Sequence, residues 1–236
     1  MIAVIPCAGH GTRMGRITQV VPKELLPFGN KLVIDFILEE LLATGHQKIF
    51  VIIREGKEAI RNYILKHYPS RYFQFVYQLQ PKGLGHAYLQ VKGLIDEPFL
   101  GILPDHLAFG GITEKIWQRY RIISQKENQP FIFKSCVRIS LKEAQFSTGR
   151  RPGEEITPFR STGRTIYPPE FLDFISENDY DPYFNEINER VPEEKFAKSY
   201  KIYSHRIKGK VWDIGTLEGY LFYLKRYLSF CVSKTQ

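Results

Sequence analysis

The chain opens with an apolar run that leads directly into a glycine-bearing loop, and this pair of features constrains the fold most. Residues 2–6, Ile-Ala-Val-Ile-Pro, have the length and β-branched content of a buried strand. Residues 8–13 follow with two glycines, which free the backbone to approach a ligand closely. Arg13 lies on this loop, and Lys23 follows ten residues later. A strand, a glycine loop and two cations together predict a site for a polyphosphate.

Beyond this loop, short apolar runs alternate with stretches of helical periodicity. We expect strands at residues 48–53, 73–78, 98–103, 131–137 and 200–207, and helices at residues 32–44, 57–68, 114–126, 168–175, 184–190 and 217–228. Strands and helices that alternate at this spacing are typical of a largely parallel sheet wound with helices. We therefore predict an α/β fold, with a single Rossmann-like domain over residues 1–236 and a mixed, mostly parallel sheet flanked by helices.

For two segments the pattern predicts more than the type of element. Residues 140–165 are rich in Gly, Arg, Pro, Thr and Ser, so we expect a loop or lid with short strands there. In the last helix, the spacing of the leucines predicts a core-facing stripe. That stripe would consist of Leu217, Leu221, Leu224 and Leu228.

The composition restricts the class of protein and of partner. No stretch approaches the roughly 20 apolar residues of a membrane span, so we expect no membrane association. The three cysteines are far apart, which favours a reduced, cytoplasmic chain and argues against structural zinc. The net charge of +8 suits an anionic partner. Because the basic residues are dispersed, we favour a nucleotide with a phosphorylated small molecule over nucleic acid. A homo-oligomer is left open.

The glycine loop differs from the two commonest phosphate loops. Met14 occupies the third glycine position of a GxGxxG motif, and no GxxxxGK[ST] string occurs in the chain. A tight turn is the plain alternative for a glycine pair of this kind. What favours a functional loop is the compound pattern, Gly-x-Gly-Thr-Arg-Met at residues 9–14 followed by Pro-Lys-Glu-Leu-Leu-Pro at residues 22–27.

This compound pattern resembles the nucleotide-sugar pyrophosphorylases, most closely the bacterial UTP–glucose-1-phosphate uridylyltransferases. The resemblance resumes at residues 83–87 (Gly-Leu-Gly-His-Ala), 103–105 (Leu-Pro-Asp) and 212–216 (Trp-Asp-Ile-Gly-Thr). It implies one nucleotidyltransferase domain, with a nucleotide-binding half at about residues 1–110 and an acceptor-binding half at about residues 111–236. The match is good over the first half and poor over residues 140–200.

The resemblance also implies a reaction. A nucleoside triphosphate and a sugar 1-phosphate would give a nucleotide-sugar and pyrophosphate, without a covalent enzyme intermediate. The protein would hold two polyanions together and neutralise the charge that grows on the leaving group. The implied catalytic residues are Arg13 and Lys23. The implied nucleotide-binding residues are Ala8, Gly9, Gly11, Thr12, Gln78 and Gly83. Gln78 matches the glutamine that reads a pyrimidine base in the family, which favours UTP or dTTP, and Gln80 is a nearby alternative for this role.

Two aspartates are candidate ligands of Mg²⁺. In the family, an aspartate after a strand and an aspartate before Gly-Thr share this ion, and Asp105 and Asp213 match those positions. Magnesium takes only one or two carboxylates together with substrate phosphates, so two suffice. The plain alternatives are a helix cap for Asp105 and a turn residue for Asp213. His106 stands where a second acidic residue is common in the uridylyltransferases.

The acceptor half departs from the family. The family's Glu-Lys-Pro segment is absent, and the nearest stretch is residues 153–160. Candidate acceptor-binding residues are Glu155, Arg160 and Arg164, with Arg150 and Arg151 as further candidates for the missing cation. Two alternatives therefore stay open: a cytidylyltransferase acting on a non-sugar phosphate or phosphonate acceptor, and a non-catalytic binding or regulatory subunit. A dinucleotide-dependent oxidoreductase is disfavoured by the glycine spacing.

Overall fold

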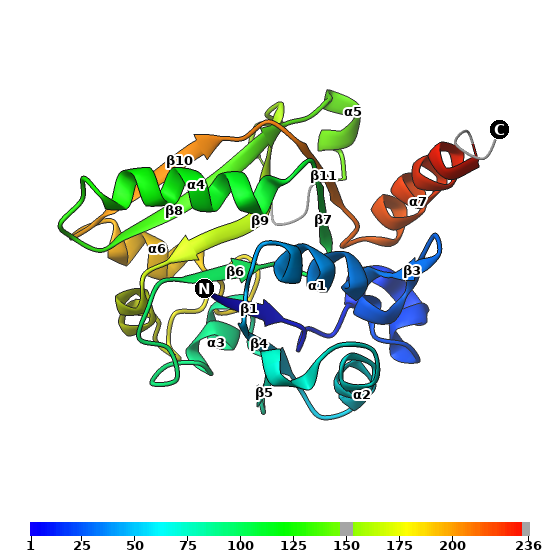
Figure 1. Cartoon of the computed structure of the whole chain (residues 1–236), viewed down its shortest axis with the longest axis horizontal. Helices are drawn as coiled ribbons and strands as arrows, with labels where there is room; N and C mark the ends of the chain where they lie inside the picture. Colours follow the sequence, from blue (N-terminus) through cyan, green and yellow to red (C-terminus); the bar gives the residue numbers. More distant parts are fainter. Residues whose placement is uncertain (147–152, 233–236) are drawn as a thin grey trace.

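A seven-stranded mixed sheet forms the centre of the protein. The computed structural model describes residues 1–146 and 153–232. The strand order is β10-β8-β9-β6-β1-β4-β5 (Figure 1). The strands are β1 (Ile2–Pro6), β4 (Lys48–Ile53), β5 (Phe73–Tyr77), β6 (Phe99–Ile102), β8 (Phe131–Arg138), β9 (Phe159–Tyr167) and β10 (Lys201–Arg206). All neighbours pair in parallel except β9, which runs antiparallel to both β6 and β8. The predicted mixed, mostly parallel sheet is confirmed.

Helices cover both faces of this sheet, which explains the unbroken apolar run in β1. Ala3 and Ile5 belong to one buried cluster, whereas Ile2 and Val4 belong to another, as the two-residue period of a strand requires. The first cluster includes residues of α1 (Val33–Ala43), α2 (Glu58–His67), α4 (Ile112–Ser124) and α7 (Leu217–Val232). The second includes residues of α3 (Leu84–Leu89), the 3-10 helix η4 (Pro169–Phe174) and α6 (Arg190–Phe196).

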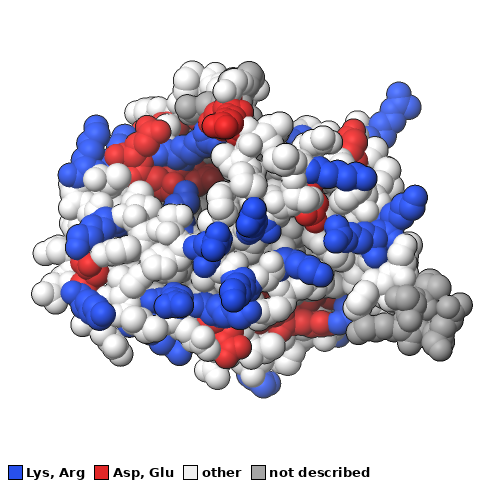
Figure 2. Space-filling view, turned by 90° about the horizontal axis from the view of Figure 1, so that it is seen from above, with Lys and Arg blue, Asp and Glu red and all other residues white. Residues whose placement is uncertain are grey.

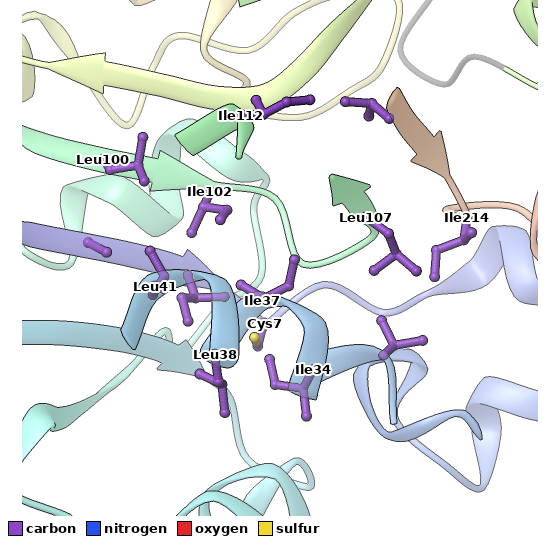
Figure 3. Packing of buried hydrophobic residues seen from close by; sticks show 14 of the residues in the cluster. Cys7, Ile34, Ile37, Leu38, Leu41, Leu100, Ile102, Leu107, Ile112 and Ile214 are labelled. Carbon is purple, nitrogen blue, oxygen red and sulfur yellow. The ribbon is translucent and has the colours of Figure 1, made fainter. Parts of the chain in front are cut away.

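A small two-stranded sheet stands beside the large one and was not expected from the sequence. Its strands β7 (His106–Phe109) and β11 (Lys210–Asp213) are antiparallel, with Asp213 opposite His106. Figure 3 shows Leu107 and Ile214 side by side in the adjoining core. This pairing brings the chain around residue 105 to the chain around residue 213. The remaining short elements are η1 (Thr12–Gln19), η2 (Lys23–Leu25), β2 (Pro27–Phe28), β3 (Lys31–Leu32), η3 (Ser70–Tyr72) and α5 (Leu141–Ala144).

The segment expected to be a loop or lid with short strands, residues 140–165, contains most of β9, a nine-residue strand in the interior of the sheet. Its polar composition concealed it, because buried polar side chains are unusual in a central strand. In the structure they have partners: the hydroxyl groups of Ser135 and Thr162 are 2.6 Å apart across the β8–β9 pair. The helix expected at residues 184–190 is also wrong, since that stretch is a turn region and α6 begins at Arg190.

The face that α7 turns toward the core is aromatic rather than leucine-rich. Leu221 and Leu228, two of the leucines expected in the buried stripe, are 54% and 46% exposed. Tyr220 and Tyr223 are buried instead. Aromatic side chains bury more apolar area than leucine and stack on one another, so they determine how the helix docks.

The described surface is charged and mixed. Figure 2 shows lysine and arginine side chains spread over one face with acidic side chains among them. Among the helices of residues 1–146 and 153–232, none has both the length and the hydropathy that a bilayer crossing needs.

Candidate active site

A cavity of about 1360 Å³ opens beyond the carboxyl ends of the parallel strands. Open α/β sheets bind their ligands at this edge. Segments that follow β1, β5 and β6 line it, and so does the chain after β11. The sequence-predicted residues that line the cavity are Ala8, Gly9, Gly11, Thr12, Arg13, Lys23, Gln78, Gly83 and Asp105.

The glycine loop after β1 leaves room for a ligand. Gly11 adopts the left-handed conformation, with φ of 71°, and η1 begins directly after it. The Thr18 hydroxyl donates to the Gly11 carbonyl at 2.9 Å and holds this turn. A Cβ at Gly9 would meet no protein atom within 4 Å, so the chain's own packing does not require a glycine there. Gly9, Thr12 and Arg13 are exposed at the cavity.

Lys23 and Asp105 form an ion pair at the base of the cavity. Lys23 Nζ lies 2.5 Å from Asp105 Oδ2, and the two side chains are only 16% and 11% exposed. Burial would raise the pKa of Asp105, but Lys23, His106 and Arg13 together hold it well below its ordinary value. Burial would likewise lower the pKa of Lys23, but Asp105 and Glu24 raise it. Both groups are therefore charged at neutral pH.

A second ion pair, fully buried, fixes the segment that carries Lys23. Lys57 Nζ lies 3.0 Å from Glu24 Oε2 and donates to the Cys7 carbonyl at 2.7 Å. The Lys57 and Glu24 side chains are 5% and 1% exposed. This contact ties η2 to the end of β1. Figure 3 shows Cys7 in the same core cluster as Ile34, Ile37 and Leu38 of α1. The sequence indicated Glu24 only as part of the motif around Lys23, and nothing in it pointed to Lys57.

Asp105 and Asp213 converge on one point, beside Gly215. A Cβ at Gly215 would lie 2.9 Å from Asp105 Oδ2 and 3.2 Å from Asp213 Oδ1. The backbone fixes this arrangement, since the Ile214 N–H donates to the Asp105 carbonyl at 2.9 Å. The Gly215 N–H donates to Asp213 Oδ1 at 3.0 Å. His106 Nε2 lies 3.4 Å from the other oxygen of Asp213.

This donor set fits a hard divalent cation that completes its coordination with substrate phosphates. Asp105 lines the cavity, whereas Asp213 is buried beside Gly215, which lines the cavity too. Among the described residues, no group of three or more His, Cys, Asp or Glu side chains is arranged as a metal site. A site enclosed by protein ligands alone, of the structural zinc kind, is therefore not what residues 1–146 and 153–232 provide.

Gln78 lies at the carboxyl end of β5 and is held by its amide nitrogen. Gln78 Nε2 donates to the Gly83 carbonyl at 3.2 Å and lies 2.7 Å from His86 Nδ1. Burial lowers the pKa of His86, so its neutral ring can accept this hydrogen bond. Gly83 has a φ of 119°, and a Cβ there would lie 2.7 Å from the Ile187 carbonyl. A glycine is thus required at 83 by contact with the chain itself.

The structure does not bring the predicted acceptor arginines to the cavity. Arg164 is fully buried: its guanidinium pairs with Glu40 at 2.5 Å and donates to the His106 carbonyl at 2.6 Å. Arg160 is 4% exposed and donates to the Tyr223 hydroxyl at 2.7 Å. Both arginines join elements of the core, and neither lines the described cavity.

In residues 153–158, the acidic side chain that lines the cavity is not the one expected from the sequence. Glu155 is exposed but does not line it, whereas its neighbour Glu154 does. Arg190, which the sequence did not indicate, lines the same side. Arg150 and Arg151, the further candidates for the acceptor cation, lie outside the described residues.

The fold and this site define a nucleotidyltransferase. Residues 2–132 match the family model described as Nucleotidyl transferase, and the chain belongs to that family. It is 30% identical to a UTP–glucose-1-phosphate uridylyltransferase of Pseudomonas aeruginosa, over 92% of each chain. It is also 26% identical to a putative enzyme of that name from Bacillus subtilis, over 93% of each. The structure of a UDP-glucose pyrophosphorylase complexed with UDP-glucose superposes with a TM-score of 0.80 and 25% identity, covering 97% of this chain and 98% of the other. The expected family, enzyme class and fold are confirmed.

Proposed function

We propose that this protein is a Mg²⁺-dependent nucleotidyltransferase that joins UTP or dTTP to a sugar 1-phosphate, forming a nucleotide-sugar and releasing pyrophosphate. The observation that carries the proposal is the convergence of Lys23, Asp105 and Asp213 beyond the carboxyl ends of the strands. The names of its relatives support the same substrates, since the Pseudomonas aeruginosa protein is a UTP–glucose-1-phosphate uridylyltransferase.

The phosphates of the nucleotide bind over the glycine loop. Its backbone N–H groups and the Arg13 guanidinium are donors for phosphate oxygens, and a guanidinium can hold the leaving pyrophosphate by two hydrogen bonds. Lys23 keeps Asp105 ionised and adds a positive charge at the base of the cavity. Bound Mg²⁺, held by Asp105 and Asp213, would supply further charge neutralisation for the phosphates. The phosphate of the acceptor then displaces pyrophosphate at the α-phosphorus.

The orientation of Gln78 favours uracil or thymine over cytosine. Its amide nitrogen is occupied by the Gly83 carbonyl and His86, which turns the amide oxygen into the group available to a base. An amide oxygen accepts hydrogen bonds, so it suits the N3–H donor of uracil and thymine. The N3 of cytosine is itself an acceptor and would oppose it. This observation supports UTP or dTTP rather than CTP as the nucleotide.

A pyrophosphate-release assay tests the proposal. We expect release with UTP or dTTP and α-D-glucose 1-phosphate as the first acceptor tested, and little with CTP. Lys23→Ala and Asp213→Asn should each lower kcat by about 10² or more, because each removes a preorganised charge contact. Lys201→Ala and Asp173→Asn are matched controls, since both residues form exposed ion pairs elsewhere and should leave kcat unchanged. Near-normal kcat in Asp213→Asn would remove the metal assignment.

A further inference from the structure

One wall of the cavity is formed by the loop at residues 181–190. Asp181 is fully buried at its start and organises it. Asp181 Oδ1 accepts from the backbone N–H of Tyr183 at 2.9 Å, and Oδ2 accepts from the Asn188 side chain at 3.0 Å. The side-chain oxygen of Asn188 in turn accepts a hydrogen bond from the backbone N–H of Arg190 at 3.0 Å. Hydrogen bonds of this kind give the loop one shape although it lacks regular secondary structure.

This loop is fastened to the nucleotide side of the cavity. The N–H of Gly85 donates to the Ile187 carbonyl at 2.8 Å, and the Ile187 N–H donates to the Lys82 carbonyl at 2.7 Å. A Cβ at Gly85 would lie 2.6 Å from the Asn188 carbonyl, so the two backbones approach as closely as glycine allows. The position of residues 181–190 relative to the base-binding residues is therefore fixed.

Arg190 is the basic side chain that this wall contributes. The lysine and arginine residues among the described lining residues are Arg13, Lys23 and Arg190, and the first two serve the nucleotide phosphates and the carboxylate pair. Arg190 Nη1 donates to Glu154 Oε1 at 2.8 Å, and its guanidinium lies 5.7 Å from the centre of the Phe184 ring. The Glu154 carboxylate thus accepts from the Arg190 guanidinium, a group that binds phosphate by the same kind of hydrogen bond.

We propose that Arg190 binds the phosphate of the acceptor and that Glu154 is an internal competitor, which the phosphate displaces. This inference rests on the proposed function, because that reaction requires a phosphorylated acceptor opposite the nucleotide. The Arg190 and Glu154 side chains are 32% and 39% exposed, and an ion pair this exposed contributes little, so exchanging its partner costs little. A phosphate dianion offers more charge and more acceptor oxygens than one carboxylate.

The test compares Michaelis constants in variants whose effects should have opposite signs. Arg190→Gln should raise KM for α-D-glucose 1-phosphate about 10- to 100-fold, the loss expected for a charged hydrogen bond, while KM for UTP stays within about twofold. Arg190→Lys should recover part of the loss. Glu154→Gln should lower KM for the sugar phosphate a few-fold, because it removes the competitor. Arg226→Gln is the matched control, since Arg226 pairs with Glu143 away from the lining residues.

Each contrary outcome has a separate meaning. An equal rise in KM for UTP and for the sugar phosphate in Arg190→Gln would show loosening of the loop and overturn the inference. A higher KM in Glu154→Gln would overturn the competitor role. A wild-type protein that releases no pyrophosphate with any sugar 1-phosphate would overturn the proposed function itself. Normal wild-type turnover with an unchanged KM in Arg190→Gln would overturn this inference alone.

Discussion

At the scale of single residues, the site depends on a small number of close approaches. Gly215 is the clearest case, because oxygens of Asp105 and Asp213 lie only 2.9 and 3.2 Å from where its Cβ would stand, closer than an ordinary van der Waals contact. Its φ lies outside the left-handed region, so an alanine there would be strained by contact alone and not by its backbone.

We therefore expect Gly215→Ala to damage cation binding while the fold survives. The added methyl group would push apart the two carboxylates, which lie 2.9 and 3.2 Å from it. Binding of Mn²⁺ in the presence of UTP, followed by electron paramagnetic resonance, should weaken about tenfold or more, as expected when a ligand set is displaced. The thermal midpoint without ligands should move by only a few degrees. Unchanged Mn²⁺ affinity would show that the carboxylates do not share the ion.

The sequence indicates where a residue lies only when the residue belongs to a motif or has its partners nearby in the chain. Lys23 lines the cavity, where its motif led us to expect it, and its catalytic role stays a prediction. Arg164 and Arg160 were misplaced because their partners are remote: Glu40 is 124 residues from Arg164, and Tyr223 is 63 residues from Arg160. A buried arginine is stable only with such partners, and a sequence does not show which residues will supply them.

At the scale of elements, the junction of α1 with α4 contains a buried histidine that sets a pH dependence. His46 Nε2 accepts from Trp117 Nε1–H at 3.1 Å, and His46 Nδ1 lies 3.2 Å from the Leu41 carbonyl. This pattern requires the neutral ring, with its proton on Nδ1. Burial lowers the pKa of His46 from 6.5 to about 4.

This histidine should make the protein less stable as the pH falls from about 6.5 toward 4. The unfolded chain binds the proton first in that window, so protonation favours unfolding. Between pH 7 and pH 5, the loss in free energy of unfolding that is due to His46 should be about 2 kcal/mol. Urea unfolding at the two pH values measures it, and His46→Gln should lack this part of the loss. Equal losses in the wild type and the variant would contradict the assignment.

Elements were predicted well where the hydrophobic pattern is strong. The run at residues 48–53 is β4 as expected, since every position but the first is buried on one face of the sheet or the other. The failures have a common cause in tertiary packing. Polar residues of β9 pair across the sheet, and α7 docks by its tyrosines, so in both places long-range contacts override the local pattern.

At the scale of the whole molecule, two walls of different origin enclose one cavity. The first, on the nucleotide side, comprises the segments after β1 and β5, which lie in the part of the chain that matches the family model, whereas residues 181–190 lie beyond that match. The net charge of +8 favours anions in general and does not distinguish the two substrates. Discrimination must come from the walls themselves, and they are joined by the contacts of Ile187 with Lys82 and Gly85.

Ligands that reach one wall or both should therefore protect different segments from amide hydrogen exchange. UTP with Mg²⁺ should protect residues 8–13, whereas UDP-glucose, which spans both substrates, should also protect residues 181–190. At 100 times its dissociation constant, either ligand should stabilise the folded state by about 2.7 kcal/mol and raise the thermal midpoint by about 5–10 °C. In Arg190→Gln, protection by UTP should persist, since the contact proposed for Arg190 is with the acceptor phosphate and not with the nucleotide. A bound sugar phosphate must restrict the opening of the loop that holds it. If UDP-glucose protected only the segments that UTP protects, residues 181–190 would therefore not be the acceptor wall.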